Sequence, residues 1–440
     1  MTKDNKIINN SDLMPSAKYN QGNNRIGLLI STVAVVVMLS LSSPAKAAAD
    51  SVSSSTYKSL TEIQEQIGNN QLEEAYIELK ALHQEVDIET IDEALVLQML
   101  GYTEMSRNNY DEAIIYLKRS LSLGLLPESV KYNVGYMVAQ LYAAQEKFTE
   151  ALVFAKEWFT TIKEPTAAQY IFMANIFAQT QNYKDAIPYT EKAIAMTPEP
   201  KENWYQLLIA SNFEVKQYSA AAAALSSAIS YWPENSNYWE QLASVYMILE
   251  ENTKGLATLQ LAWKSGVLDK ETSVKSMVQL AITQGIPEHA ARLIVMAMEQ
   301  NILPEDADYL ATLANAWVAA KEYTPAITAF EKLAEVTEES EPYLNIANLY
   351  VEKAQWQPAE LALNKALSGE LEEPGKAWLV MGITMTEQKK FGEGLAAFRK
   401  ARAFSYSEGQ ANNWLEYAAD LQRQHNWITR NKAANDTATQ

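Results

Sequence analysis

Small and large apolar residues recur along most of the chain with a period of roughly 35 residues. A small residue stands at ten positions separated by 33 to 38 residues, namely Ala75, Ala113, Ala151, Ala186, Ala221, Gly255, Ala290, Ala326, Ala359 and Gly394. Around each of them, larger apolar residues follow the three- and four-residue spacing of an amphipathic helix. Polar pairs such as Gln181-Asn182 and Lys321-Glu322 precede an aromatic residue and indicate turns. The pattern predicts ten antiparallel helix pairs, with each small residue where two helices touch.

One copy of the repeat shows the apolar positions most completely, as Tyr170, Met173, Ala174, Phe177, Tyr183, Ala186, Ala193 and Pro198. This order of large and small residues resembles the tetratricopeptide repeat (TPR), a helix-turn-helix unit of 34 residues. The resemblance implies an all-α fold, a TPR-type α-solenoid in which about ten repeats form a right-handed superhelix. The first copy matches poorly, with Ser59 and Ile63 at its large and small positions.

The ends of the array follow from the last matching positions. We expect the repeats at residues 56–407, after a short linker at 48–55. Residues 408–428 carry a polar face and are expected to form a helix that covers the end of the array. Residues 429–440 are expected to be a disordered tail.

The N-terminus has the layout of an export signal. Residues 26–41 are apolar and uncharged, Lys18 and Arg25 precede them, and Ala45-Lys46-Ala47 follows. A basic region, an apolar run and small residues at a cleavage point are typical of a Sec signal peptide, which predicts cleavage after residue 47 and a periplasmic protein. The alternative is an uncleaved membrane anchor, although the run is short for a span of about 20 residues. Met14 is an alternative start that would leave a compact basic region.

Composition excludes several classes of function. The formal net charge of −18 disfavours nucleic acid and anionic membranes, and it indicates either solubility or a basic partner. The chain has no cysteine, which excludes disulfides, cysteine metal sites and a lipoprotein. Its three histidines, His83, His289 and His425, fall in separate parts of the array, and no nucleotide-binding or hydrolase motif is present. We therefore predict neither an enzyme nor a metal, cofactor or small-molecule substrate.

One position of the first helix in each repeat carries polar residues on an otherwise apolar face. The ninth helix position, counted from the third copy onward, is polar in six of seven copies and holds Gln140, Asn175, Ala210, Ser244, Gln279, Asn315 and Asn348. Amides both donate and accept hydrogen bonds, and this arrangement resembles peptide-binding TPR domains, where asparagines at this position hold the ligand backbone. We predict a partner-binding groove from these polar residues, with Glu214, Glu240 and Glu352 meeting basic side chains. The alternative is a solvated surface or amides that bond neighbouring helices. The fifth position holds no lysine, so a carboxylate clamp is not expected.

Three segments have a characteristic sequence, namely Leu100-Gly101-Tyr102, Tyr132-Asn133-Val134-Gly135 and the segment from Gln145 to Ala151. Together with the chain length, the signal segment and the atypical first repeat, they make the chain over about residues 55 to 425 resemble the TPR proteins encoded beside TonB energy-transduction systems. The resemblance implies a periplasmic scaffold that assists TonB, ExbB and ExbD in iron–siderophore transport across the outer membrane. The alternative is a TPR factor for envelope assembly, secretion or polysaccharide export.

Overall fold

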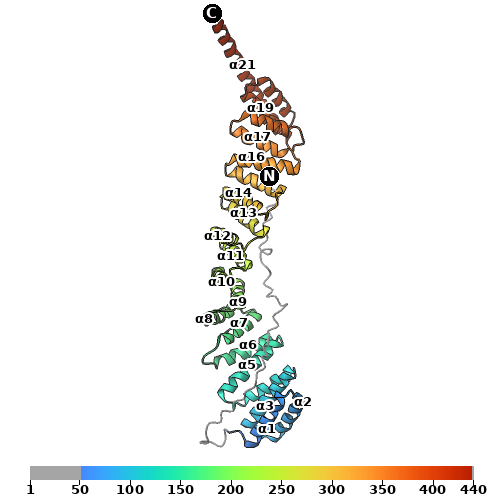
Figure 1. Ribbon diagram of the computed structural model, residues 1–440, viewed down its shortest axis with the longest axis vertical. Helices are drawn as coiled ribbons and strands as arrows, with labels where there is room; N and C mark the ends of the chain where they lie inside the picture. Colours follow the sequence, from blue (N-terminus) through green and yellow to red (C-terminus); the bar gives the residue numbers. More distant parts are fainter. Residues whose placement is uncertain (1–50, 439–440) are drawn as a thin grey trace. The chain divides into compact units, whose positions relative to one another are not determined.

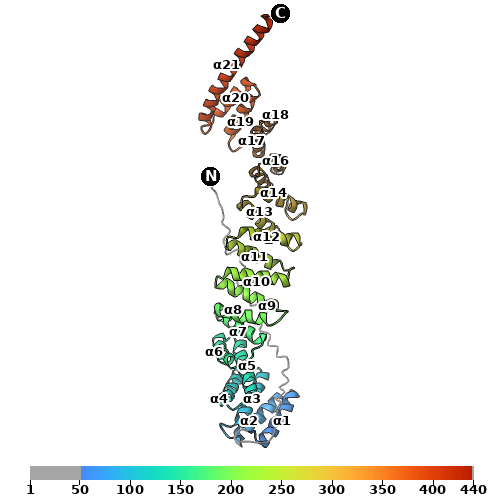
Figure 2. The ribbon, with the colours of Figure 1, turned by 90° about the vertical axis from the view of Figure 1, so that its left-hand side faces the viewer.

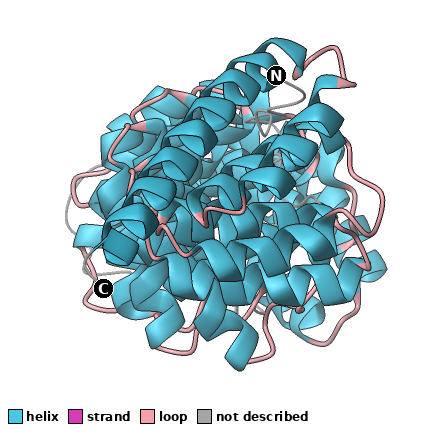
Figure 3. Cartoon of the chain, turned by 90° about the horizontal axis from the view of Figure 1, so that it is seen from above, coloured by secondary structure: helices cyan, strands magenta, loops and turns pink. Residues whose placement is uncertain are grey.

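The protein consists of α-helices joined by short turns. The computed structural model describes residues 51–438, with side chains up to residue 431. In this part of the chain there are 21 helices and no strand (Figure 3). The predicted all-α fold of TPR-type helix pairs is confirmed. The expected signal peptide at 1–47 lies outside the described residues.

The first ten helices form one compact unit that ends at Pro233. They are α1 (Ser54–Gly68), α2 (Leu72–Glu85), α3 (Ile91–Ser106), α4 (Tyr110–Ser122), α5 (Glu128–Ala144), α6 (Phe148–Thr160), α7 (Ala167–Gln179), α8 (Tyr183–Ala195), α9 (Glu202–Glu214) and α10 (Tyr218–Tyr231). Each odd-numbered helix pairs with the even-numbered helix after it, and the pairs follow one another in chain order within this unit (Figures 1 and 2). We call this part unit 1.

The remaining helices form a second compact unit that begins at Glu234, called unit 2. They are α11 (Ser236–Ile248), α12 (Asn252–Lys264), α13 (Glu271–Thr283), α14 (Pro287–Glu299), α15 (Ala307–Ala319), α16 (Tyr323–Thr337), α17 (Glu341–Glu352), α18 (Trp356–Ala366), α19 (Pro374–Glu387), α20 (Phe391–Arg402) and α21 (Glu408–Ala438). The sequence predicted one uninterrupted array, whereas the chain divides in its middle. The connection between the units contains Pro233, which cannot continue a helix.

The ten small residues occupy one structural position. Each is the fourth residue of an even-numbered helix, and all ten are buried. Ala186, Ala221 and Ala326 have no exposed surface, as predicted. At Gly255 an added Cβ would lie 3.2 Å from the backbone oxygen of Ala243 in the paired helix. The two helices of a pair therefore approach so closely that only Ala or Gly fits between them.

The turn within each helix pair also has one geometry. The residue two places before every even-numbered helix has a positive φ, and it is Gly285 once and a non-glycine residue nine times, for example Gln181 and Lys321. The next residue donates its backbone N–H to a carbonyl of the preceding helix, as Glu322 does to Trp317 at 2.9 Å. This is the hydrogen bond of a Schellman motif, which satisfies a carbonyl at the helix end.

A buried carboxylate joins the first two repeats. The Glu104 side chain is 2% exposed, and its oxygens accept hydrogen bonds from Arg107 Nη1 at 2.8 Å and Asn109 Nδ2 at 2.7 Å. Arg107 also donates to Glu73 on α2 and lies 4.2 Å from the centre of the Tyr76 ring. Because both charges have partners, α3 is fixed against α2 without an unpaired buried charge.

The last helix covers the end of unit 2 and is longer than predicted. Ala411 and Ala418 pack in a core cluster with Phe398, whereas Trp427 is 68% exposed. The helix begins at Glu408 as expected but ends at Ala438, so the disordered tail predicted at 429–440 is wrong for residues 429–438. No Pro or Gly follows Gly409, and the alanines and lysine of this segment favour continued helix. At the other end α1 starts at Ser54, two residues inside the predicted linker. None of the helices within residues 51–438 is long and apolar enough to span a membrane.

Replacement of Ala221 by Leu tests the close contact within a helix pair. We expect Ala221→Leu to lower the free energy of unfolding by about 1–3 kcal/mol, because the added carbons have no space beside α9. The matched control is Ala223→Leu, at an exposed position of the same helix, which should change it by less than about 0.5 kcal/mol. Urea unfolding measures both. Equal effects of the two variants would contradict the assigned packing.

Replacement of Lys321 by Gly tests the turn geometry. Lys321 has φ 61°, where a side chain adds strain of about 1–2 kcal/mol, and glycine removes it at an entropic cost below about 1 kcal/mol. We therefore expect Lys321→Gly to raise the free energy of unfolding by about 0.5–1 kcal/mol. Gly285→Ala, where φ is 70° and nothing lies within 4 Å of the new Cβ, should lower it. Thermal unfolding of both variants measures these changes. A destabilised Lys321→Gly would contradict the assigned strain at this turn position.

Candidate functional site

The predicted groove residues all lie on odd-numbered helices, but they are divided between the two units. Gln140, Asn175 and Glu214 lie on α5, α7 and α9 of unit 1. The other six lie in unit 2, with Glu240 and Ser244 on α11, Gln279 on α13, Asn315 on α15, and Asn348 and Glu352 on α17. Each unit therefore has its own set of predicted residues.

Three of the polar side chains already have partners nearby. The Ser244 hydroxyl donates to the backbone oxygen of Glu240 at 2.8 Å, and Gln279 Nε2 lies 3.4 Å from the Thr283 hydroxyl. Gln140 lies one turn after Tyr136 on α5 and interacts with its hydroxyl, which lowers the pKa of Tyr136 against the larger effect of burial. For Ser244 and Gln279 the local bond corresponds to the alternative of polar residues that serve their own helix.

The three asparagines differ from these side chains. Among residues 51–438, no hydrogen bond is formed by the side chains of Asn175, Asn315 or Asn348. Asn175 is half-buried, and the other two are exposed. An amide that has no partner within the fold retains both its donors and its acceptor for a ligand.

Two of the predicted carboxylates are held by neutral hydroxyl donors. Glu240 Oε1 accepts a hydrogen bond from the Ser273 hydroxyl on α13 at 2.6 Å. Glu352 Oε1 accepts one from the Tyr323 hydroxyl at 2.6 Å, and this bond raises the pKa of Tyr323 above its usual value. Because the donors are uncharged, they position the carboxylates without cancelling their negative charge.

A similar pair was not found from the sequence. The Tyr309 hydroxyl on α15 donates to Glu271 Oε1 on α13 at 2.7 Å, and burial together with this bond raises the pKa of Tyr309 well above its usual value. This pair could not be predicted from the repeat pattern, because Glu271 and Tyr309 are 38 residues apart and occupy different positions of their repeats.

The side chains around Gln140 form an aromatic surface in unit 1. The Tyr136 ring stacks on Trp158 with centroids 4.7 Å apart and meets Phe172 edge-on at 5.0 Å. Burial raises the pKa of Tyr136. Phe172 lies one turn before Asn175 on α7, so Tyr136, Gln140 and Asn175 belong to neighbouring parts of the α5 and α7 surface.

Two further residues orient this surface. Trp158 Nε1 donates to the backbone oxygen of Tyr132 at 2.9 Å, which fixes the indole ring. Gly135 gives the ring its space, since an added Cβ there would lie 2.7 Å from Trp158 Cδ1. The segment from Tyr132 to Gly135 therefore holds Trp158 under Tyr136.

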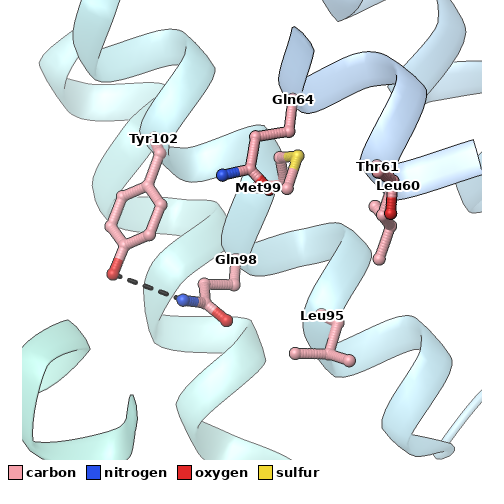
Figure 4. Close-up of a pocket in the computed structure, with 7 residues that line it drawn as sticks. All are labelled: Leu60, Thr61, Gln64, Leu95, Gln98, Met99 and Tyr102. Carbon is pink, nitrogen blue, oxygen red and sulfur yellow. Dashed lines mark hydrogen bonds between the residues drawn. The ribbon is translucent and has the colours of Figure 1, made fainter. Parts of the chain in front are cut away.

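A small pocket lies on the odd-helix face between α1 and α3 (Figure 4). It is lined by Leu60, Thr61, Gln64, Leu95, Gln98, Met99 and Tyr102. The Tyr102 hydroxyl lies 3.4 Å from Gln98 Nε2, and burial raises the pKa of Tyr102. The pocket thus combines an apolar floor with an amide and a phenol, the same two groups that meet at Tyr136 and Gln140.

This pocket was not predicted, because the polar residues at the ninth helix position were identified only from the third copy onward. Counting back by two more repeats gives Gln64 and Tyr102 at the same position. The first copy matches the repeat pattern poorly, and the polar residues at its ninth position and at that of the second copy were therefore not recognised.

The arrangement supplies hydrogen-bonding groups and apolar surface to a ligand. Among the predicted and pocket residues the polar groups are amides, hydroxyls, phenols and carboxylates, and no nucleophile–base pair is formed between them. Within the described residues, no three His, Asp or Glu side chains gather closely enough to hold a metal ion.

Comparisons with known proteins agree with the helix-pair fold. The family model for the tetratricopeptide repeat matches residues 94–123, which cover most of α3 and all of α4. No curated protein matches the sequence.

Several solved structures are similar. A TPR protein from Parabacteroides merdae is 16% identical over 60% of this chain and 99% of its own, with a TM-score of 0.35. YrrB, described as a TPR protein with an unusual peptide-binding site, is 14% identical over 44% of this chain and 94% of its own, with a TM-score of 0.35. MamA from Desulfovibrio magneticus is 16% identical over 42% of this chain and 99% of its own, with a TM-score of 0.33. The similarity is one of fold alone.

Proposed function

We propose that this protein is a periplasmic interaction scaffold that holds an extended segment of a partner protein on the odd-helix face of unit 1. The observation that carries the proposal is the surface of Tyr136, Gln140 and Asn175, where aromatic rings lie beside an amide with no partner in the fold. Rings and amides of this kind bind extended, proline-rich segments, whose backbone carbonyls remain free to accept hydrogen bonds.

The pocket between α1 and α3 adds a place for a side chain. Leu60, Leu95 and Met99 supply apolar surface, and Gln98 with Tyr102 supplies hydrogen-bonding groups at the edge. An extended segment that lies across the odd helices would place an apolar side chain here and its backbone near Gln140 and Asn175.

Charge favours a basic partner. Glu214 is exposed at the end of α9, and unit 2 carries Glu240 and Glu352, each held by a hydroxyl rather than by a cation. Lysines of the partner would meet these carboxylates, with Asn315 and Asn348 as the backbone-binding amides of unit 2. Such contacts lose strength as salt screens them.

The finer role rests on the resemblance to proteins encoded beside TonB systems. We propose that the partner is a component of a TonB–ExbB–ExbD system for iron–siderophore transport, in which a proline- and lysine-rich linker would suit this surface in shape and charge. Capture of polysaccharide-export or pilus components from periplasmic extract, with no TonB-type protein, would instead support the envelope-assembly alternative.

Binding to the periplasmic domain of the TonB-like partner tests the groove. We expect Asn175→Ala and Asn348→Ala each to weaken binding by about 1 kcal/mol, or roughly fivefold, because each removes hydrogen bonds to the ligand backbone. The matched control is Asn364→Ala, an exposed asparagine on the even-numbered helix α18, which should bind as the wild type does. Calorimetric titration at low and high salt measures the contribution of each amide to the affinity and the weakening of the charge contacts by salt. Equal affinity of Asn175→Ala and wild type would exclude the unit 1 surface.

The proposed location has a separate test. We expect the protein recovered from periplasmic extract to begin near Ala48, because Ala45-Lys46-Ala47 has the form of a cleavage site. N-terminal sequencing measures this directly. Recovery in the membrane fraction with residues 26–41 retained would show an anchored protein instead, and recovery only in the cytoplasm would contradict export.

A further inference from the structure

Three consecutive even-numbered helices of unit 1 repeat one short pattern on their exposed side. The segment from Glu74 to Lys80 on α2 reads EAYIELK, that from Glu112 to Lys118 on α4 reads EAIIYLK, and that from Glu150 to Lys156 on α6 reads EALVFAK. The alanine of each segment is the buried small residue of its helix pair, so the three segments are in structural register. Side chains three residues apart are neighbours on a helix surface. The repeated pattern therefore forms three rows across the even-helix face.

We name the rows by their chemistry. The carboxylate row is Glu74, Glu112 and Glu150; the apolar row is Ile77, Ile115 and Val153; the lysine row is Lys80, Lys118 and Lys156. The apolar side chains are 66%, 64% and 67% exposed. Single exposed apolar residues are ordinary in proteins, but here they recur at one position of successive repeats, with opposite charges on the two sides.

The lysine row is held in place by rings of the neighbouring repeats. Lys80 Nζ lies 3.3 Å from the hydroxyl of Tyr116 on α4, and Lys118 Nζ lies 3.3 Å from that of Tyr142 on α5. Lys156 Nζ lies 5.0 Å from the centre of the Phe177 ring on α7. These contacts restrict the lysines without neutralising them, so less conformational entropy is lost when they pair with a partner.

The charges of both rows are available. The ion pairs within the described part of these repeats use other residues, for example Arg107 with Glu73 and with Glu104, Arg119 with Glu93, and Lys147 with Asp111. All three carboxylates are exposed, as are Lys118 and Lys156.

The pattern also has an end. On α8 the corresponding residues are Asp185, Pro188 and Glu191, so that the lysine is replaced by a second carboxylate. The surface is therefore limited to the first three repeats and is not a general property of the array.

We propose that this surface binds a second copy of the same chain. A two-fold axis parallel to the direction in which the repeats stack would place apolar row on apolar row. The same rotation reverses the direction of each helix axis. The carboxylate row of one copy would therefore lie against the lysine row of the other. An interface of this kind is isologous, because each copy contributes the same residues.

The spacing of the rows identifies the partner as another copy. Three charges of each sign are presented at the distance between successive repeats. A single helix presents side chains at its own pitch of about 5.4 Å and cannot follow neighbouring helices packed about 8–10 Å apart. A second copy has the required spacing by construction, and it also has the opposite charge at each edge.

Sedimentation velocity of the purified protein, from about 1 μM to about 1 mM, tests the proposal, because small interfaces bind weakly. We expect a monomer–dimer equilibrium for the wild type. Ile115→Glu should weaken it at least about tenfold, since it places a charge in the centre of the interface. The matched control is Leu361→Glu on α18, which is at the same repeat position and also 67% exposed but has Pro358 and Asn364 in place of the carboxylate and the lysine, and it should dimerise as the wild type does. A wild type that stays monomeric over the whole range, or an Ile115→Glu that dimerises normally, would overturn the proposal.

Exchange of whole rows gives a second test that does not depend on which carboxylate faces which lysine. One variant carries Lys80→Glu, Lys118→Glu and Lys156→Glu, and the other carries Glu74→Lys, Glu112→Lys and Glu150→Lys. Each alone should be monomeric because like charges face each other, whereas a mixture should form a heterodimer that Ile115→Glu in either chain abolishes. Circular dichroism verifies that the variants are folded. Self-association of either variant, or no heterodimer in the mixture, would contradict the assigned pairing. Neither result depends on the peptide-binding surface of the odd helices.

Discussion

The two helices of each pair lie so close together that a side chain larger than Ala would separate them. Ala290 and Ala359 are completely buried at this contact, and at Gly394 even a Cβ would come within 2.7 Å of the Thr386 hydroxyl. The contact sets the rotation of each helix about its own axis. Once that rotation is fixed, the ninth position of the odd helix lies on one face of the pair, and the carboxylate, apolar and lysine rows of the even helices lie on the other face. The odd-helix surface and the even-helix surface both depend on this one spatial restriction.

The same restriction explains why the functional groups of the odd helices are amides and phenols. Large aliphatic residues such as Leu79, Leu100 and Leu117 are completely buried between helices. The positions left on the surface gain no stability from packing, so they are free to carry polar groups. Where a ring does remain at the surface, as at Tyr136, it stacks on Trp158, and the space for that indole comes from Gly135. The aromatic surface around Tyr136 is therefore formed within the ordinary geometry of the helix pairs.

The repeat geometry could be predicted from the sequence because it depends on residue size at a regular spacing. The positions of Ala186, Ala221 and Ala326 and the placement of Asn175 on an odd helix followed directly. Side-chain partners did not follow, because they depend on rotamers and on residues at unrelated positions: Ser244 bonds its own helix, and Tyr309 bonds Glu271. The division after Pro233 was also missed, since the spacing of small residues is the same on both sides of it. Gln64 and Tyr102 could have been found by extending the count into the atypical first copy.

In the described part of each unit, the helices that pack extensively against each other are one or two places apart along the chain. A protein of this kind has low contact order, so its contacts form without closing long loops, and folding can begin at any pair and spread to its neighbours. The N-terminal helix pairs can therefore form their contacts with each other before the later helix pairs have folded. Such a chain can acquire its native form progressively from one end, in the order in which its residues emerge from a ribosome or a translocation channel.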